Sequence, residues 1–180
     1  GNGNFTEESM SRGIVDVSFS AGVAIGDYNQ DGWLDLYFAN WRQDAINFPE
    51  NGYPDRLYQN NGDGTFSDVT LPQSMWSDVG AGLAPSFSDY DLDGDVDLLL
   101  ANDFGQFEWS DENRLFNNDN GVFTDVSQVM GFNQGINAMG IAAGDYDEDG
   151  DFDYYVTNIA ENLLLRNDID SFSDQAYQAE

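Results

Sequence analysis

The sequence predicts an all-β protein made of four-stranded antiparallel sheets, arranged as the blades of a β-propeller. Three observations lead to this fold class. A unit is repeated along the chain, its short apolar and aromatic runs are bounded by Gly, Asn and Asp, and no segment has the period and caps of a long helix. The 180 residues, 41% hydrophobic, suffice for one domain with its own core.

The repeat is clearest around three acidic loops. The first loop aspartates, Asp27, Asp89 and Asp145, are 62 and then 56 residues apart. The segments align without gaps and read AGVAIGDYNQDGWLDLYFANW (21–41), AGLAPSFSDYDLDGDVDLLLAND (81–103) and AMGIAAGDYDEDGDFDYYVTN (138–158). Each continues into a related segment, at 55–70, 112–127 and 161–175. We therefore predict three blades, at 20–70, 82–127 and 138–175, within one region spanning 1–180.

Each unit contains four expected strands, which the first unit illustrates in order. GVAIGDY precedes the acidic loop, LDLYFAN follows it, RLYQN comes third, and TFSDVT follows the turn NNGDG. Asn-Gly and Asp-Gly pairs accept the positive φ that tight hairpins need. The connections between the second and third strands, 41–54 and 103–112, vary between units, which is typical of loops that carry binding specificity. Four consecutive antiparallel strands per repeat describe a propeller blade.

The two ends of the repeat region raise the question of how many blades there are. The opening NGNFTEES is similar to the fourth strand of a unit, so residues 1–9 are expected to be the outer strand of a preceding or partner blade. Closed propellers have about 4–8 blades. Either the chain is a piece of a longer propeller, or further chains complete the ring. A short helical turn is expected only within FTEESMSRG.

The charge of the chain restricts its partners. It has 34 acidic residues, five basic residues and no His or Cys, for a net charge of −29. Nucleic acid and anionic membrane surfaces are therefore not expected as partners. Without His and Cys, the ligands for a metal are oxygens, which suit calcium, magnesium or manganese. No apolar run approaches the roughly 20 residues of a membrane-spanning helix, so membrane insertion is not expected.

The three acidic loops share the pattern D-x-[DN]-x-D-G-x-x-D, numbered here as loop positions 1 to 9. Oxygens at positions 1, 3 and 5 converge on one point if the backbone curls, which Gly at position 6 permits. Position 7 is expected to contribute its backbone carbonyl, and Asp at position 9 to close the shell. The expected ligands are Asp27, Asn29, Asp31, Trp33 and Asp35; Asp89, Asp91, Asp93, Asp95 and Asp97; and Asp145, Asp147, Asp149, Asp151 and Asp153.

Two other interpretations of these loops are weaker. An EF-hand loop needs a Glu at position 12, where this chain has Phe38, Leu100 and Val156. A solvent-exposed acidic turn explains one such loop but not three copies at matching positions. We expect about three calcium ions, one per loop. The first loop, with Asn29 and Trp33 in place of acids, should bind most weakly.

With these loops and the strands around them, the chain resembles the FG-GAP/VCBS repeats of integrin α-subunit β-propellers and of many secreted bacterial proteins. The resemblance covers nearly all of the chain. It implies calcium in the hairpin between the first two strands of each blade. It also implies an extracellular or cell-surface location. It does not imply one activity.

The function expected from the sequence is therefore binding rather than catalysis. The module is expected to act in adhesion, ligand binding or assembly, with a protein or glycan ligand and with self-association or further blades of the same protein. A lectin-like role, with Trp41 and Trp109 stacking on sugars, is the alternative. A propeller hydrolase or lyase ranks last, because every dense carboxylate pair belongs to a metal loop. Arg56 and Arg114 are expected to pair with carboxylates of their own blades.

Overall fold

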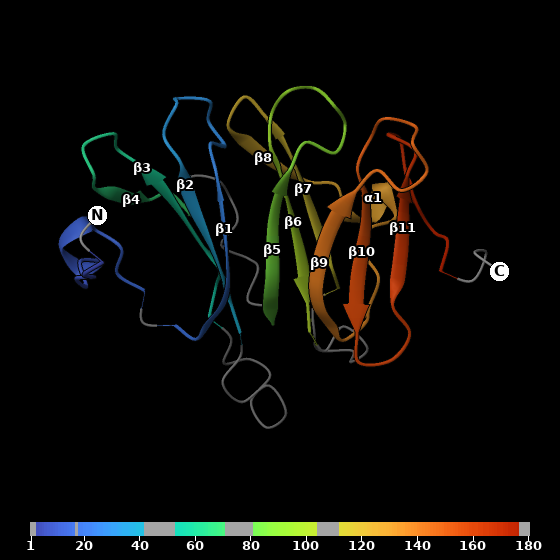
Figure 1. Ribbon diagram of the computed structural model, residues 1–180, viewed down its shortest axis with the longest axis horizontal. Helices are drawn as coiled ribbons and strands as arrows, with labels where there is room; N and C mark the ends of the chain where they lie inside the picture. The colour runs from blue at the N-terminus through green and yellow to red at the C-terminus, as the bar shows by residue number, and fades with distance from the viewer. Residues whose placement is uncertain (1–2, 17, 42–52, 71–80, 104–111, 177–180) are drawn as a thin grey trace.

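The computed structural model describes residues 3–16, 18–41, 53–70, 81–103 and 112–176 (Figure 1). These residues form three antiparallel four-stranded sheets, each with its strands in sequence order. The first sheet contains β1 (Ser20–Gly26), β2 (Asp35–Asn40), β3 (Arg56–Asn60) and β4 (Phe66–Asp68). The second contains β5 (Gly82–Ser88), β6 (Asp97–Asn102), β7 (Arg114–Asp119) and β8 (Val122–Asp125), and the third contains β9 (Ala138–Gly144), β10 (Asp153–Asn158), β11 (Leu163–Asn167) and β12 (Phe172–Asp174).

The all-β class and the four-stranded repeat are thus confirmed, and the sheets lie within the ranges expected for the three units. Strand β5 lies between β1 and β9, so the first strands of the three sheets are neighbours (Figure 1). The described residues form no closed ring. The closure of these sheets into a propeller therefore stays a prediction.

The first strands approach one another closely because they carry small residues. A Cβ added to Gly22 in β1 would lie 2.3 Å from the Leu83 carbonyl oxygen and 2.6 Å from the Pro85 ring. Each of the three strands also has an irregular register near its start, between Ser20 and Gly22 in the first sheet and at the matching place in the others. The repeated small-residue pattern before each acidic loop therefore serves the packing between sheets.

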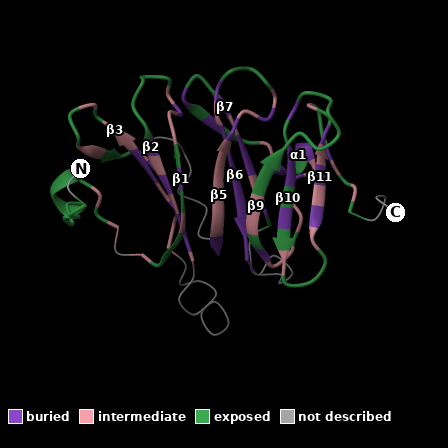
Figure 2. Cartoon of the chain, in the orientation of Figure 1, coloured by how far each residue is buried: buried purple, intermediate pink, exposed green. Residues whose placement is uncertain are grey.

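The core consists of two apolar layers, one between each pair of neighbouring sheets. Strand β6 of the middle sheet is buried at every position, because both of its faces are covered (Figure 2). Leu98 and Leu100 point into the layer shared with the first sheet, whereas Leu99 and Ala101 point into the layer shared with the third. Successive side chains of a strand point to opposite faces, so a strand that is covered on both faces needs apolar residues at successive positions.

Two short helical segments complete the described chain. The 3-10 helix η1 (Met10–Arg12) lies within the segment where a helical turn was expected. The four-residue helix α1 (Ser127–Met130) was not expected, because one turn is too short to show a period. Residues 3–9 are in no strand and Phe5 is fully exposed. A strand forms only against a partner strand, so the assignment of residues 1–9 to another blade stays a prediction.

Candidate metal centres

The backbone of each acidic loop curls in the same way. Gly at position 6 has a positive φ in all three loops: 89° at Gly32, 97° at Gly94 and 105° at Gly150. Position 4 also has a positive φ although it is never Gly: 56° at Gln30, 60° at Leu92 and 63° at Glu148. Such a backbone is strained for these residues and needs support from its surroundings.

That support comes from the loop carboxylates themselves, as the second loop illustrates. Asp89 at position 1 accepts hydrogen bonds from the backbone N–H groups of Asp93 and Gly94, each at 3.1 Å. Asp93 at position 5 accepts from the N–H of Asp95 at 2.8 Å. Position 1 makes the same two bonds in the other loops, and position 5 makes the same single bond. The side chains at positions 1 and 5 therefore point inward across the loop.

The aspartate at position 9 is buried and fixes the loop to the third strand of its sheet. In the second unit, Asp97 accepts from the N–H of Tyr90 at 3.0 Å and from the N–H of Asn118 at 2.8 Å. Asp35 and Asp153 make the equivalent pairs of bonds. Position 9 is thus a structural acceptor as well as a candidate ligand, a double role that the pattern alone does not reveal.

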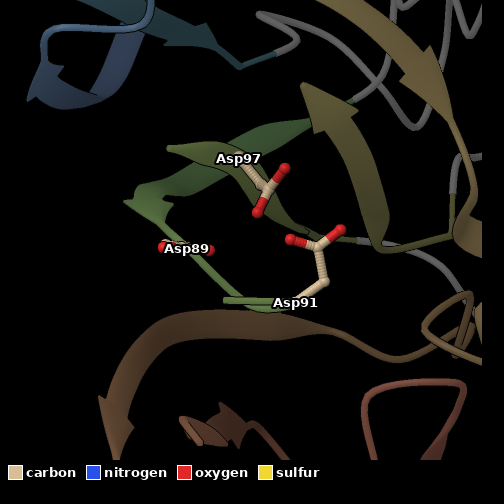
Figure 3. A group of neighbouring side chains, drawn as sticks. All are labelled: Asp89, Asp91 and Asp97. Atoms are coloured by element: carbon tan, nitrogen blue, oxygen red, sulfur yellow. The ribbon is translucent and has the colours of Figure 1, made fainter. Parts of the chain in front are cut away.

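Two of the loops bring three carboxylates together. Oxygens of Asp89, Asp91 and Asp97 lie within 4.8 Å of one another, and Figure 3 shows the three side chains gathered at the end of the hairpin. In the third loop the same holds for Asp145, Asp147 and Asp149. The first loop, which is fully described, forms no such group. Its position 3 is an amide, and Asn29 donates to Asp31 at 3.0 Å.

The side chain at position 7 does not point into the cluster in the second loop. The Asp95 carboxylate accepts from the N–H of Asn120 at 2.6 Å and also from the Gln30 amide of the first loop. The ligand that we expect from position 7 is the backbone carbonyl, which leaves this side chain free for such contacts. In the third loop, Asp151 has a buried carboxylate oxygen without a partner in the described residues.

Burial and mutual repulsion weaken the acidity of these carboxylates. Burial raises the pKa of Asp97 to about 7 and that of Asp35 to about 6, against the effect of their backbone hydrogen bonds. Desolvation and the carboxylates of Asp149 and Asp153 raise the pKa of Asp151 to about 6. A divalent cation removes this penalty, because it favours the ionised form of each ligand.

These pKa values predict that the calcium-free protein is more stable in mild acid. Raised pKa values mean that the folded state binds more protons than the unfolded state between about pH 4 and pH 7. The free energy of unfolding should therefore fall as pH rises through this window. We expect a higher melting temperature at about pH 5 than at about pH 7.5 in buffer passed over a chelating resin. With excess calcium the difference should shrink or reverse, since protons compete with the ion. A higher melting temperature at the upper pH without calcium would contradict these pKa values.

Sequence reasoning missed the residues that the third strands contribute to the loops. Asn117 on β7 donates to Asp91 at 3.0 Å, and Arg166 on β11 lies with its Nε 3.7 Å from Asp147. Both occupy the same position of their strands. Aligning the units places both residues at one position. The residue type there differs from unit to unit, so the pattern does not mark them as contacts of the loops.

The remaining expectations have mixed outcomes. Arg114 pairs with Asp125 at 2.8 Å and Arg56 with Asp68 at 3.8 Å, as expected. Trp41 is half-buried and its indole N–H lies 3.4 Å from Asp103. Trp109 and most of the connections 41–54 and 103–112 lie outside the described residues. Among the described residues, no helix has the length and apolar character needed to cross a membrane.

Comparisons with known proteins agree with the repeat. The sequence model of the FG-GAP-like repeat matches residues 42–100 and 89–156. Cartilage acidic protein 1 of Xenopus tropicalis is 29% identical over 171 residues, which cover 86% of this chain but 24% of that protein. The proteins of the same name from Mus musculus and Homo sapiens are 33% and 32% identical over 121 residues, which cover 64% of this chain and 16% of each relative. The chain thus spans at most about a quarter of these relatives.

Proposed function

We propose that this chain, which belongs to the FG-GAP-like repeat family, is a calcium-binding module of an extracellular protein. In this proposal its sheets are blades of a β-propeller and it acts in adhesion, ligand binding or assembly. The observation that carries the proposal is the threefold repetition of one loop geometry, with inward carboxylates at positions 1 and 5 and a buried Asp at position 9.

The donor set fits calcium. It consists of carboxylates, one amide and backbone carbonyls, and calcium takes six to eight oxygen ligands in flexible geometry. In the second and third loops, three carboxylates already lie close together. Magnesium demands a stricter octahedron and usually keeps several waters, which fits a loop with five candidate oxygens less well. The ion would neutralise the cluster and hold the hairpin of the first two strands, while the loop residues position one another through their hydrogen bonds.

An extracellular location is supported by two considerations. Extracellular calcium modules bind with dissociation constants of about 10⁻⁴–10⁻³ M, so loops without the bidentate Glu of an EF-hand can still fill where calcium is abundant. In addition, the relatives are named after cartilage, a tissue that consists largely of extracellular matrix. The partner in this proposal is a protein or a glycan that contacts the variable connections. The contact between the Trp41 N–H and Asp103 does not decide for or against the lectin-like alternative, because stacking on a sugar uses the face of the ring.

Calorimetric titration of the metal-free protein with calcium tests the proposal. Position 5 offers a matched series, because Asn in place of Asp keeps the acceptor for the backbone N–H and removes the charge. We expect about three sites in the unaltered protein, and the loss of one site in each of Asp31→Asn, Asp93→Asn and Asp149→Asn. Asp31→Asn should remove the weakest site.

The control for the titration is Asp119→Asn, which removes an exposed charge outside the loops and should leave every site intact. Magnesium at the same concentration should compete weakly. The absence of binding heat in the unaltered protein, confirmed by equilibrium dialysis, would overturn the proposal.

A further inference from the structure

The first and second acidic loops are connected by one side chain. Gln30, at position 4 of the first loop, donates from its amide nitrogen to the carbonyl oxygen of Gly94 at 3.1 Å and to the carboxylate of Asp95. Gly94 and Asp95 are positions 6 and 7 of the second loop. Gln30 is exposed, whereas Asp95 is buried. The contact therefore joins two candidate ion sites that lie in different sheets.

Both ends of this contact adjoin expected ligands. Gln30 stands between Asn29 and Asp31, which are positions 3 and 5 of the first loop, and its φ of 56° belongs to the curl of that loop. At the other end, Asp95 is the residue whose backbone carbonyl is the expected ligand at position 7 of the second loop. An ion in either loop therefore restricts the backbone at one end of the contact.

The backbone that carries Gln30 is itself held by the second sheet. Asn118 donates to the carbonyl of Tyr28 at 2.7 Å. The turn at Gly121 packs against Asn29, because a Cβ added to Gly121 would lie 3.5 Å from the Asn29 Cβ. Three consecutive positions of the first loop, of which Gln30 is the last, thus contact the second sheet.

The second and third loops lack the equivalent contact. Position 4 of the second loop is Leu92, whose exposed side chain cannot donate a hydrogen bond. The counterpart of Asp95 in the third loop is Asp151, which is buried to the same extent. One oxygen of Asp151 has no hydrogen-bond partner in the part of the chain that the structure describes. The donor at position 4 thus satisfies a buried carboxylate of the next loop in one pair of loops and not in the other.

We infer that Gln30 couples the ion sites of the first and second loops, so that calcium in one loop raises the affinity of the other. The inference rests on the proposed calcium binding. An ion in the first loop fixes Asn29 and Asp31, and with them the backbone of Gln30. A fixed Gln30 loses less conformational entropy when its side chain holds Asp95. Position 7 of the second loop is then ordered before its own ion arrives, which lowers the cost of binding.

The coupling matters most for the first loop, which is expected to bind most weakly. Coupling between two binding sites is reciprocal, so a filled second loop raises the affinity of the first by the same factor. Such factors are typically about 5–150-fold, and we expect about 5–10-fold from one side-chain contact. Repulsion between the two ions acts in the opposite direction. Salt screens this repulsion over a Debye length of about 8 Å at 0.15 M ionic strength, so the coupling is measured in that salt.

Calorimetric titration with calcium measures the coupling in a cycle of three proteins. All three carry Asp149→Asn, which silences the third loop. One has both remaining loops active, one has only the second active through Asp31→Asn, and one has only the first active through Asp93→Asn. The overall affinity of the two-site protein, divided by the product of the two single-site affinities, gives the coupling factor. We expect about 5–10 in this cycle and about 1 when every protein also carries Gln30→Leu.

Leu92→Gln is the matched counterpart of Gln30→Leu, because the two variants exchange the residues at position 4. It provides the second loop with a donor for Asp151, and should create coupling between the second and third loops when the first is silenced by Asp31→Asn. Both variants suit the local backbone, since Gln30 and Leu92 have nearly the same φ, 56° and 60°. The melting temperature of each variant without calcium checks that it folds.

The titrations separate failure of this inference from failure of the proposed function. Single-site proteins that give no binding heat would overturn calcium binding itself. Sites that bind calcium but fill independently while Gln30 is present would overturn the coupling, as would a coupling factor that Gln30→Leu leaves unchanged. Independent filling of the second and third loops in Leu92→Gln would count against the donor at position 4 as the cause of the coupling.

Discussion

Removing calcium is expected to lower the melting temperature of this protein by about 10 °C or more at neutral pH. A ligand that binds only the folded state, at 100 times its dissociation constant, contributes about 2.7 kcal/mol per site. For a chain of this size, 1 kcal/mol corresponds to about 2–4 °C. Each filled site should then raise the melting temperature by about 5–11 °C. The two carboxylate clusters alone, around Asp91 and Asp147, account for the expected drop.

Scanning calorimetry in a calcium series and in excess chelator measures this effect. The melting temperature should rise with the logarithm of free calcium once the sites begin to fill. Sodium chloride at matched ionic strength is the control, because a net charge of −29 makes any cation stabilising through screening. Equal melting temperatures in calcium and in matched sodium chloride would mean that the loops hold no ion.

The fold could be predicted to the level of individual sheets because its signals are local and repeated. Each acidic loop, the small-residue strand before it and the turn after the third strand recur in three units. Strand boundaries such as Asp35–Asn40 follow from the end of the loop and from the polar Asn that ends the apolar run. Helix α1 was not predicted because a single turn is too short to show a helical period in the sequence.

The candidate ligands could be found from the sequence, but the directions of their side chains could not. The pattern counts Asp95 as one more acid of the second loop, whereas its side chain turns to Asn120 and Gln30. It counts Asp97 as a ligand, whereas that carboxylate also accepts two backbone N–H groups. Which way a carboxylate points depends on neighbours that the chain brings from 21 to 65 residues away.

The contacts between sheets were the least accessible from sequence. Asn118 lies just before the turn at Asn120 and Gly121, in a sequence (NNDNG) where Asn is expected for turn formation alone. Only the structure shows that its side chain reaches Tyr28, 90 residues earlier. A signal did exist, since Asn occupies this place in all three units, at Asn60, Asn118 and Asn167. A turn requirement explains that repetition equally well, so the sequence alone does not separate the two causes.

The double role of position 9 leads to the second large effect. Asp97→Ala should destabilise the protein by about 2–5 kcal/mol even without calcium, because two buried backbone N–H groups lose their acceptor at about 1–3 kcal/mol each. Relief of the buried charge, whose pKa is raised to about 7, offsets part of this loss. Urea unfolding at neutral pH, with and without calcium, measures the free energy of unfolding.

Asp147→Asn is the counterpart that separates a ligand from a structural acceptor. Partial desolvation and the carboxylates of Asp149 and Asp153 raise the pKa of Asp147, so its ionised form is disfavoured in the calcium-free loop. Neutralising it should leave the calcium-free protein unchanged or more stable, and should weaken the protein only when calcium is present. Asp97→Ala should lower stability in both conditions, and more with calcium. If both variants were destabilised equally with and without calcium, hydrogen bonding alone would explain why the acidic loops have the same shape in the three units. If Asp97→Ala were harmless without calcium, its bonds to Tyr90 and Asn118 would contribute nothing measurable to the fold.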